Sequence, residues 1–172
     1  NLITSKDCPA FGGVYKLAAI WSEEERRFLP KIKISENAEK ITNPGDKKVY
    51  RIYDLQGMIV ADLIALSDEV FSPEEPLLLF DPIETWKKTL LPGGSYRIRE
   101  LLIPVFAKGN CVYESPKVMD IQKRCREELA TLWEESKRFE YPHQTYVDLS
   151  KKLWNVKNSL LEQYQTGASG QA

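Results

Sequence analysis

Apolar and polar positions alternate along the first half of the chain, and this period of two residues is typical of β-strands. The alternating runs cover residues 14–20, 31–35, 49–53 and 58–66. The first two runs flank a charged segment, so we expect a hairpin with an exposed acidic and basic tip, with a short helix at 22–27 as the alternative. The last two are joined by four residues, a common length for a hairpin connection.

The second hairpin suggests an ion pair. If Tyr53 pairs with Met58, Arg51 lies diagonal to Asp62 on the same face of the sheet. A long side chain reaches a diagonal neighbour. We interpret Arg51 and Asp62 as a structural ion pair, with a ligand-binding pair as the alternative.

The middle of the chain changes character at residues 67–76, which contain two prolines and four acidic side chains. This composition indicates an internal boundary or a long surface loop. An apolar run at 77–82 follows, and Lys108-Gly109-Asn110 between two further apolar runs predicts another hairpin. Pro104 has no amide hydrogen to donate, so its strand is expected at a sheet edge or at a bulge.

The third quarter of the chain predicts a helix with Ser115 as its cap and Pro116 at its first position. Lys137 and Arg138 are expected in its last turn, where positive charge suits the helix dipole. One face of this helix is apolar at helical spacing. That face consists of Val118, Ile121, Cys125, Leu129 and Leu132.

A second helix is predicted from about Asp148 or Ser150, after an extended linker around Pro142. The fold class is therefore α+β, with antiparallel hairpins and small sheets followed by two C-terminal helices.

Composition narrows the function classes. The chain has 172 residues, 42% hydrophobic and 28% charged, with a net charge of −1. This balance argues against a surface for nucleic acid or anionic lipid. Three scattered cysteines, Cys8, Cys111 and Cys125, do not form a disulfide framework. We therefore expect a reducing, cytoplasmic location.

Residues that carry chemistry are few. His143 is the single histidine and has no partners at metal-ligand spacing, so we interpret it as a surface or packing residue. Neither pair of adjacent glycines, at 12–13 and at 93–94, extends to a dinucleotide or P-loop motif.

Four lysines fall in and after two strands predicted to be neighbours, close to the first glycine pair. They are Lys16, Lys31, Lys33 and Lys40. Ammonium groups beside glycine-rich backbone can hold phosphate oxygens. Lysines on a sheet edge also serve simply to discourage aggregation. Spacing alone favours the second interpretation.

Longer segments resemble a known family, in order along nearly the whole chain. The segments FGGVYKL (11–17), KIKISENAEKITNPGDKKVYR (31–51), LLIPVFAKGN (101–110) and YVDLSKKLWNVKNSLLE (146–162) resemble the C-terminal part of nicotinate phosphoribosyltransferases. The sequence begins at Asn1 without a methionine and ends in a small, polar run. We therefore interpret it as a fragment that lacks most of the catalytic α/β barrel.

The resemblance implies an activity for the intact protein. Such enzymes join nicotinate to phosphoribosyl pyrophosphate, giving nicotinate mononucleotide and pyrophosphate, with ATP hydrolysis and magnesium, in salvage toward NAD. The fold implied is that of a type II phosphoribosyltransferase, whose C-terminal portion packs on its own N-terminal and barrel domains, with a homodimer as one option. The phosphorylated histidine, the substrate-binding arginine and the glycine-threonine phosphate loop belong to the barrel, and His143 does not match that histidine.

The resemblance therefore places no catalytic residue and no metal ligand in this chain, and we expect the segment alone to be inactive and to bind no cofactor. It implies phosphate-binding roles for Asn1, Lys16 and Lys33. The implied division has the end of the barrel region at 1–12, a β-rich segment beside the active site at 13–66, and a C-terminal α+β domain at 67–172 whose tail from about 166 is disordered. The alternative is a free-standing, non-catalytic interaction module.

Overall fold

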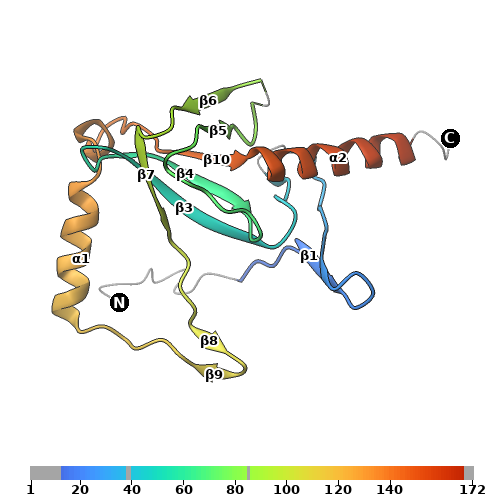
Figure 1. The fold of residues 1–172 in the computed structure, drawn as a ribbon, viewed down its shortest axis with the longest axis horizontal. Helices are drawn as coiled ribbons and strands as arrows, with labels where there is room; N and C mark the ends of the chain where they lie inside the picture. The colour runs from blue at the N-terminus through green and yellow to red at the C-terminus, as the bar shows by residue number, and fades with distance from the viewer. Residues whose placement is uncertain (1–12, 38–39, 85, 169–172) are drawn as a thin grey trace, which may run out of the picture.

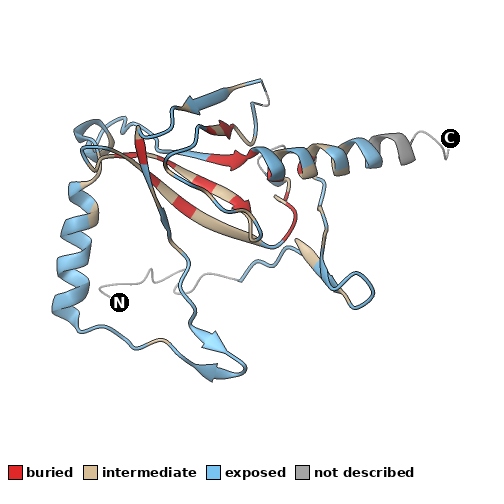
Figure 2. Cartoon of the chain, viewed as in Figure 1, coloured by how far each residue is buried: buried red, intermediate tan, exposed pale blue. Residues whose placement is uncertain are grey.

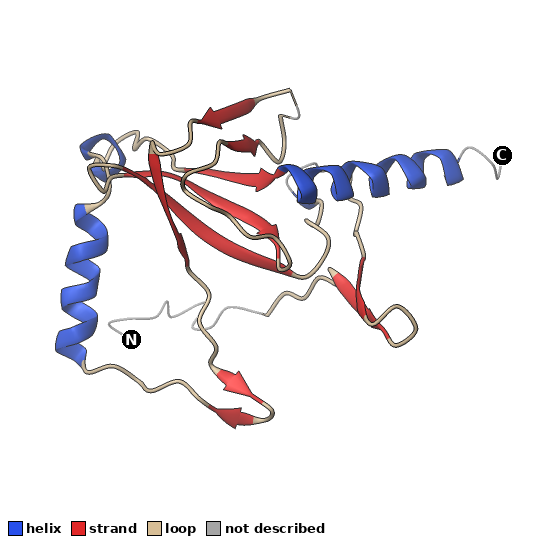
Figure 3. Ribbon diagram, in the orientation of Figure 1, coloured by secondary structure: helices blue, strands red, loops and turns tan. Residues whose placement is uncertain are grey.

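The computed structural model describes residues 13–37, 40–84 and 86–168. Asn1, Cys8 and the last residues of the predicted tail lie outside this part of the chain. Figure 3 shows a mixture of strands and helices, which confirms the predicted α+β class. The domain boundaries at 12 and 66 stay predictions.

The described strands form one large sheet and two isolated hairpins (Figure 1). The hairpins are β1 (Ala19–Ser22) with β2 (Arg27–Pro30), and β8 (Phe106–Ala107) with β9 (Asn110–Cys111). The large sheet has six strands in the order β6 (Lys88–Leu91), β5 (Leu77–Phe80), β10 (Tyr146–Ser150), β4 (Ile59–Leu66), β3 (Lys47–Asp54) and β7 (Tyr96–Glu100). β10 runs parallel to β4, whereas the other neighbours are antiparallel.

Strand β10 is the largest departure from the predicted elements. Residues 146–150 were expected to belong partly to a linker and partly to a helix, and they form a central strand instead. Leu149 pairs with Ile64 of β4 on one side and with Phe80 of β5 on the other. The helix α2 (Lys151–Ala168) follows without a loop, close to its predicted start, and it runs into the region predicted as tail.

The sheet has to curl because of its connections. β6 and β7 are its two edges, yet they are consecutive in the chain and only residues 92–95 join them. A flat sheet of six strands is about 24 Å wide at roughly 4.8 Å per gap. The link from Leu91 to Tyr96 spans at most about 18 Å. The two edges therefore approach each other, and the concave face of the sheet closes on itself.

The turn that joins the edges packs against the loop before β5. The Gly94 amide donates a hydrogen bond to the Pro73 carbonyl oxygen at 2.8 Å. Gly93 lies so close to this loop that a Cβ atom there would be 2.1 Å from the Glu74 carbonyl oxygen. Glycine is required at position 93 because two backbone segments touch.

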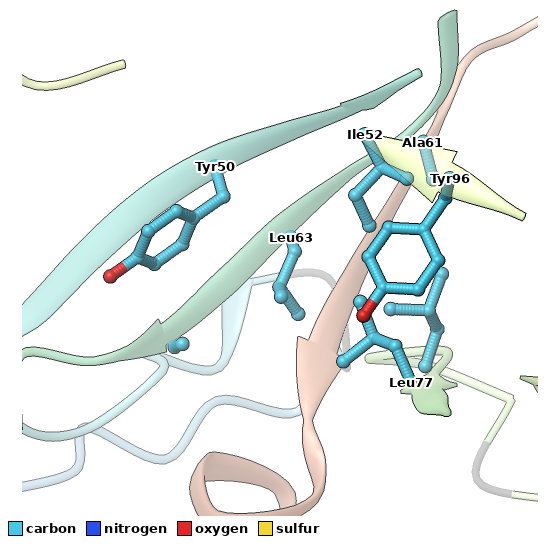
Figure 4. Packing of buried hydrophobic residues seen from close by; sticks show 8 residues of the cluster. Tyr50, Ile52, Ala61, Leu63, Leu77 and Tyr96 are labelled. Atoms are coloured by element: carbon cyan, nitrogen blue, oxygen red, sulfur yellow. The ribbon is translucent and has the colours of Figure 1, made fainter. Parts of the chain in front are cut away.

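Tyr96 fixes the same loop from inside the curl. Its hydroxyl lies 2.9 Å from the Ser72 carbonyl oxygen and 3.0 Å from that of Glu75, so its proton is shared between two acceptors. In Figure 4 the Tyr96 ring lies over Leu77, across the curl from its own strand. The loop 67–76 thus connects strands of one sheet, as the surface-loop interpretation expected.

Two apolar clusters occupy the two faces of the sheet. The concave cluster consists of Tyr50, Ile52, Ala61, Leu63, Ala65, Leu77, Leu79 and Tyr96 (Figure 4). The opposite cluster consists of Phe80, Leu149 and Leu153, with Trp154 packed against it. Since Leu153 and Trp154 belong to α2, the second cluster holds this helix on the sheet.

The first hairpin has the charged segment as its turn, as predicted. The predicted strands at 14–20 and 31–35 were too far from the turn, and the helix at 22–27 was wrong. Trp21 pairs with Phe28, and their rings meet edge to face with centroids 5.2 Å apart. Because this aromatic pair stabilises the pairing next to the exposed turn at Glu23–Arg26, the strands lie closer to the turn than predicted.

The first helix is shorter than predicted. α1 (Val118–Ala130) begins after Lys117, whose extended backbone forms the cap, so Ser115 and Pro116 precede the helix. Lys137, predicted in the last turn of this helix, lies instead in a separate 3-10 turn, η2 (Glu134–Lys137). The helix ends before η2 because the Thr131 carbonyl oxygen accepts a hydrogen bond from the Ile59 amide of β4 at 2.9 Å, instead of continuing the helical hydrogen bonds.

Most of α1 and the β8–β9 hairpin lie away from the sheet. Figure 2 shows both elements as exposed along their length, and α1 has no buried residue. Pro104 lies in the coil between β7 and β8, not within a strand. The predicted apolar face of the helix exists, but no other described element covers it.

We predict that Gly93→Ala lowers the free energy of unfolding of the intact protein by about 1–3 kcal/mol, because the new methyl group forces two backbone segments apart. The control is Gly13→Ala, where the nearest atom to the new Cβ is 3.6 Å away. Urea titration of both variants measures the difference. Equal stability of the two variants would contradict the close approach that closes the curl.

Candidate functional site

The predicted phosphate-binding lysines lie in coil segments that the fold brings together. The Lys16 ammonium donates a hydrogen bond to the Lys40 carbonyl oxygen at 3.0 Å. The Thr42 amide donates to the Lys33 carbonyl oxygen at 3.3 Å, and the Ala18 carbonyl oxygen accepts from the amides of residues 31 and 45. Segments 16–18, 31–33 and 40–45 are therefore neighbours, although their residues are not in strands as expected.

Lys16 and Lys33 both have exposed side chains. Lys16 uses one of its three ammonium protons on Lys40, and Lys33 makes no side-chain hydrogen bond or ion pair with the described residues. An exposed ammonium with spare donors attracts anions, and phosphate oxygens are good acceptors for it. This geometry is compatible with both interpretations of the lysines, and Asn1 lies outside the described residues.

A cleft of about 340 Å³ lies between the β1–β2 hairpin and α2. It is lined by Trp21, Arg27, Phe28, Pro30, Gly45, Asp46, Leu66, Ser67, Asp68, Lys152 and Val156. Lys152 pairs with Asp68 at 2.6 Å. The sequence analysis missed this cleft because its walls come from distant parts of the chain.

Arg51 is the centre of a charged network between the sheet and α1. Its Nε and Nη2 atoms donate to the two carboxylate oxygens of Asp62 at 2.8 and 3.0 Å. Nη1 lies 3.5 Å from Glu128 of α1, and Arg99 of β7 donates to the same carboxylate at 2.7 Å. The hydrogen bond with Asp62 raises the pKa of Arg51. The predicted ion pair is confirmed.

The register of that pair differs from the prediction. Arg51 lies directly opposite Asp62, not diagonal to it, for two reasons. Tyr53 pairs with Ile59, not with Met58, and one extra residue of β4 between Ile59 and Ala61 shifts the register once more. The alternation of apolar and polar residues does not reveal a bulge in advance, because a bulge adds one residue without a sequence pattern of its own.

The network attaches the C-terminal end of α1 to the sheet. The Trp133 indole nitrogen adds a hydrogen bond to the Ile59 carbonyl oxygen at 2.7 Å. Two arginines on neighbouring strands share the Glu128 carboxylate, so both lose a partner if it is removed. This arrangement is structural, since every charge in it is matched by another charge of the protein.

The remaining candidate residues lie on the surface. His143 is exposed, and its ring meets Tyr146 edge to face at 6.4 Å. Cys111 and Cys125 are exposed free thiols. Within the described residues, no three His, Cys, Asp or Glu side chains gather as a metal site requires. Neither described helix has the length and apolar composition that a membrane crossing requires.

Comparison with known proteins identifies the family. The family described as "Nicotinate phosphoribosyltransferase C-terminal domain" matches residues 46–157, more than half of the chain. The nicotinate phosphoribosyltransferase of Bacillus subtilis is 40% identical over 158 residues, and that of Caenorhabditis elegans is 32% identical over 162 residues. The chain belongs to the nicotinate phosphoribosyltransferase family.

This chain spans only part of its nicotinate phosphoribosyltransferase relatives. The match covers 91% of this chain but 31% of the Bacillus subtilis enzyme, and 93% of this chain but 27% of the Caenorhabditis elegans enzyme. The crystal structure of human nicotinic acid phosphoribosyltransferase shares its fold, with a TM-score of 0.62 and 23% identity over 69% of this chain and 23% of that chain.

Some candidate residues of this nicotinate phosphoribosyltransferase segment lie inside the range of the family match and others lie before it. Arg51, Asp62 and Glu128 lie inside residues 46–157, whereas Lys16 and Lys33 precede them. The network that holds α1 is thus part of the C-terminal domain itself. The lysines belong to the segment that leads into this domain.

We predict that Glu128→Ala destabilises the intact protein by about 1–3 kcal/mol, because two arginines lose their shared carboxylate. The matched control is Glu127→Ala, which removes an exposed side chain 3.9 Å from Lys123 and should change stability by less than about 0.5 kcal/mol. Urea titration measures both. A Glu128→Ala variant as stable as its control would show that the network does not hold the helix.

Proposed function

We propose that this chain is the C-terminal portion of an enzyme that converts nicotinate and phosphoribosyl pyrophosphate to nicotinate mononucleotide and pyrophosphate, with hydrolysis of ATP. The observation that supports it most is the family match over residues 46–157, together with 40% identity to the Bacillus subtilis enzyme along 91% of the chain. The described residues are arranged as a scaffold, so the reacting groups come from the rest of the polypeptide.

In this proposal the N-terminal and barrel domains pack on an exposed arm, residues 101–130, which consists of the β8–β9 hairpin, α1 and the coil that joins them to β7 and to each other (Figure 2). Isolated helices of this length are marginal in water. Yet α1 has 13 residues, none of them buried. The arm exposes large apolar side chains in its coil, its hairpin and its helix, namely Ile103, Phe106, Val118, Met119, Ile121 and Leu129. The relatives are about three times as long as this chain, which leaves ample polypeptide to cover these residues.

Lys16 and Lys33 have a role at the edge of the active site. The reaction separates a highly charged pyrophosphate from a ribose that becomes positive, so fixed positive charge near the leaving group stabilises the transition state. The two lysines lie on neighbouring coil segments and have ammonium protons to donate. We assign them to the phosphates of phosphoribosyl pyrophosphate or ATP.

Magnesium and ATP belong to the intact enzyme in this proposal. Magnesium usually binds one or two carboxylates together with substrate phosphates. We place the protein ligands of magnesium on the other domains of the enzyme, with the substrate phosphates as the remaining ligands.

We predict that Lys33→Ala in the intact enzyme raises the KM for phosphoribosyl pyrophosphate or ATP by about three- to tenfold, because a charged donor to phosphate is lost. Steady-state kinetics with each substrate varied in turn measure this effect. Lys31→Ala is the control, since Lys31 is also exposed and lies two residues away.

The comparison between the two variants decides the role of Lys33. Unchanged kinetics in Lys33→Ala, or equal effects in both variants, would return Lys33 to the class of solvated surface lysines. Absence of nicotinate mononucleotide formation by the intact wild-type enzyme would overturn the proposed function itself.

A further inference from the structure

A small polar cavity opens at the β6 side of the large sheet. Its volume is about 150 Å³. It is lined by Asp81, Lys87, Thr89, Tyr146 and Asp148. Asp148 and Tyr146 come from β10, Thr89 comes from β6, and the other two residues lie in the connection between β5 and β6.

Asp148 is the unusual residue of this cavity. It is only 6% exposed, and its carboxylate makes no hydrogen bond or ion pair with the described residues. Its backbone partner on β4 is Leu63, a fully buried apolar residue. Burial raises the pKa of Asp148, the charge of Asp81 raises it further, and Lys87 lowers it. Its oxygens do not belong to the fully buried polar atoms that lack a hydrogen-bond partner, so they reach the cavity, where a bound group can contact them.

The neighbouring charges have other partners. The Asp81 carboxylate accepts hydrogen bonds from the amides of Ile83 and Glu84, both at 2.8 Å. The Lys87 ammonium lies 3.5 Å from Glu84 and 5.1 Å from the centre of the Tyr146 ring.

The ammonium group of Lys157, which interacts electrostatically with Asp81, is also occupied. Lys157 of α2 donates to the Pro82 carbonyl oxygen at 3.1 Å. Since Lys87 and Lys157 have other contacts, the carboxylate of Asp148 can pair with a further cation inside the cavity.

We propose that this cavity binds a guanidinium or primary ammonium group, with Asp148 as its counter-ion. Such a group donates several hydrogen bonds in one direction, which suits an acceptor-only carboxylate in a cavity of this size. A divalent metal ion fits less well, because only two carboxylates line the cavity and the Lys87 ammonium is part of its wall.

Two sources can supply this chemistry. One is an arginine or lysine side chain of the polypeptide that packs beside the sheet in the intact enzyme. The other is a free amine or guanidinium compound. The proposal does not depend on the phosphoribosyl transfer reaction, and its test uses thermal stability instead of activity.

The test is the melting temperature of the intact protein with Asp148→Asn, a substitution that keeps the shape of the side chain and removes its charge. If a side chain of the protein occupies the cavity, Asp148→Asn lowers Tm by about 2–4 °C at pH 7, because an ion pair is lost. Asp68→Asn, in an exposed pair with Lys152, is the control and should leave Tm nearly unchanged.

Methylguanidinium chloride tests the second source. If the cavity is open to free ligands, Asp148→Asn raises Tm without ligand, because a carboxylate with a raised pKa is penalised when ionised. Methylguanidinium then raises the Tm of the wild-type protein but not that of Asp148→Asn. Either pattern supports the proposal, and the two patterns distinguish the sources.

The simplest competing explanation is that Lys87 itself pairs with Asp148, and the variant Lys87→Met tests it. Under the proposal, the Tm change caused by Asp148→Asn keeps its sign with and without Lys87→Met, because the charge of Lys87 changes only its size. Two results overturn the proposal. One is a Tm loss in Asp148→Asn that disappears in the double variant. The other is an unchanged or raised Tm in Asp148→Asn with no Asp148-dependent response to methylguanidinium.

Discussion

The insertion of β10 between β4 and β5 is the interaction on which the rest of this structure depends. β10 is the last strand in the chain, and it pairs in parallel with β4 and antiparallel with β5. In the described sheet no strand of the β3–β4 hairpin pairs directly with a strand of the β5–β6 hairpin, so β10 is the link between them. The strand also determines the position of α2. Ser150 is the last residue of β10. Its hydroxyl accepts a hydrogen bond from the Leu153 amide of α2 at 3.1 Å and donates one to Glu69 at 2.6 Å.

The predicted and observed elements differ mainly where pairing is long-range. The β3–β4 hairpin, the α2 helix and the Arg51–Asp62 ion pair follow from local patterns, and the structure contains all three. β10 was missed because YVDLS lacks a clean apolar alternation and continues directly into a helix. Its Asp148 faces a cavity, and its partners lie about 70 to 90 residues earlier in the chain. The curl of the sheet depends on the same distant pairings.

The candidate site could be predicted less well than the fold. Local spacing pointed to four lysines without separating phosphate binding from solvation, and only the family resemblance singled out Lys16 and Lys33. The fold brings the segments of these two lysines together. The cleft beside Trp21 and the cavity beside Asp148 have walls from separate strands and helices, so no local motif describes them. The proposed function therefore depends on the family relationship, because the described residues have the pattern of a scaffold.

Synthesis of labelled nicotinate mononucleotide from labelled nicotinate, phosphoribosyl pyrophosphate, ATP and magnesium tests the central claim most directly. The claim is that this portion supports a reaction whose catalytic groups lie elsewhere in the enzyme. The assay compares the intact enzyme with the 172-residue chain alone, after circular dichroism has shown that the chain is folded. The account predicts product from the intact enzyme and none from the chain alone. Product formed by the chain alone would contradict it.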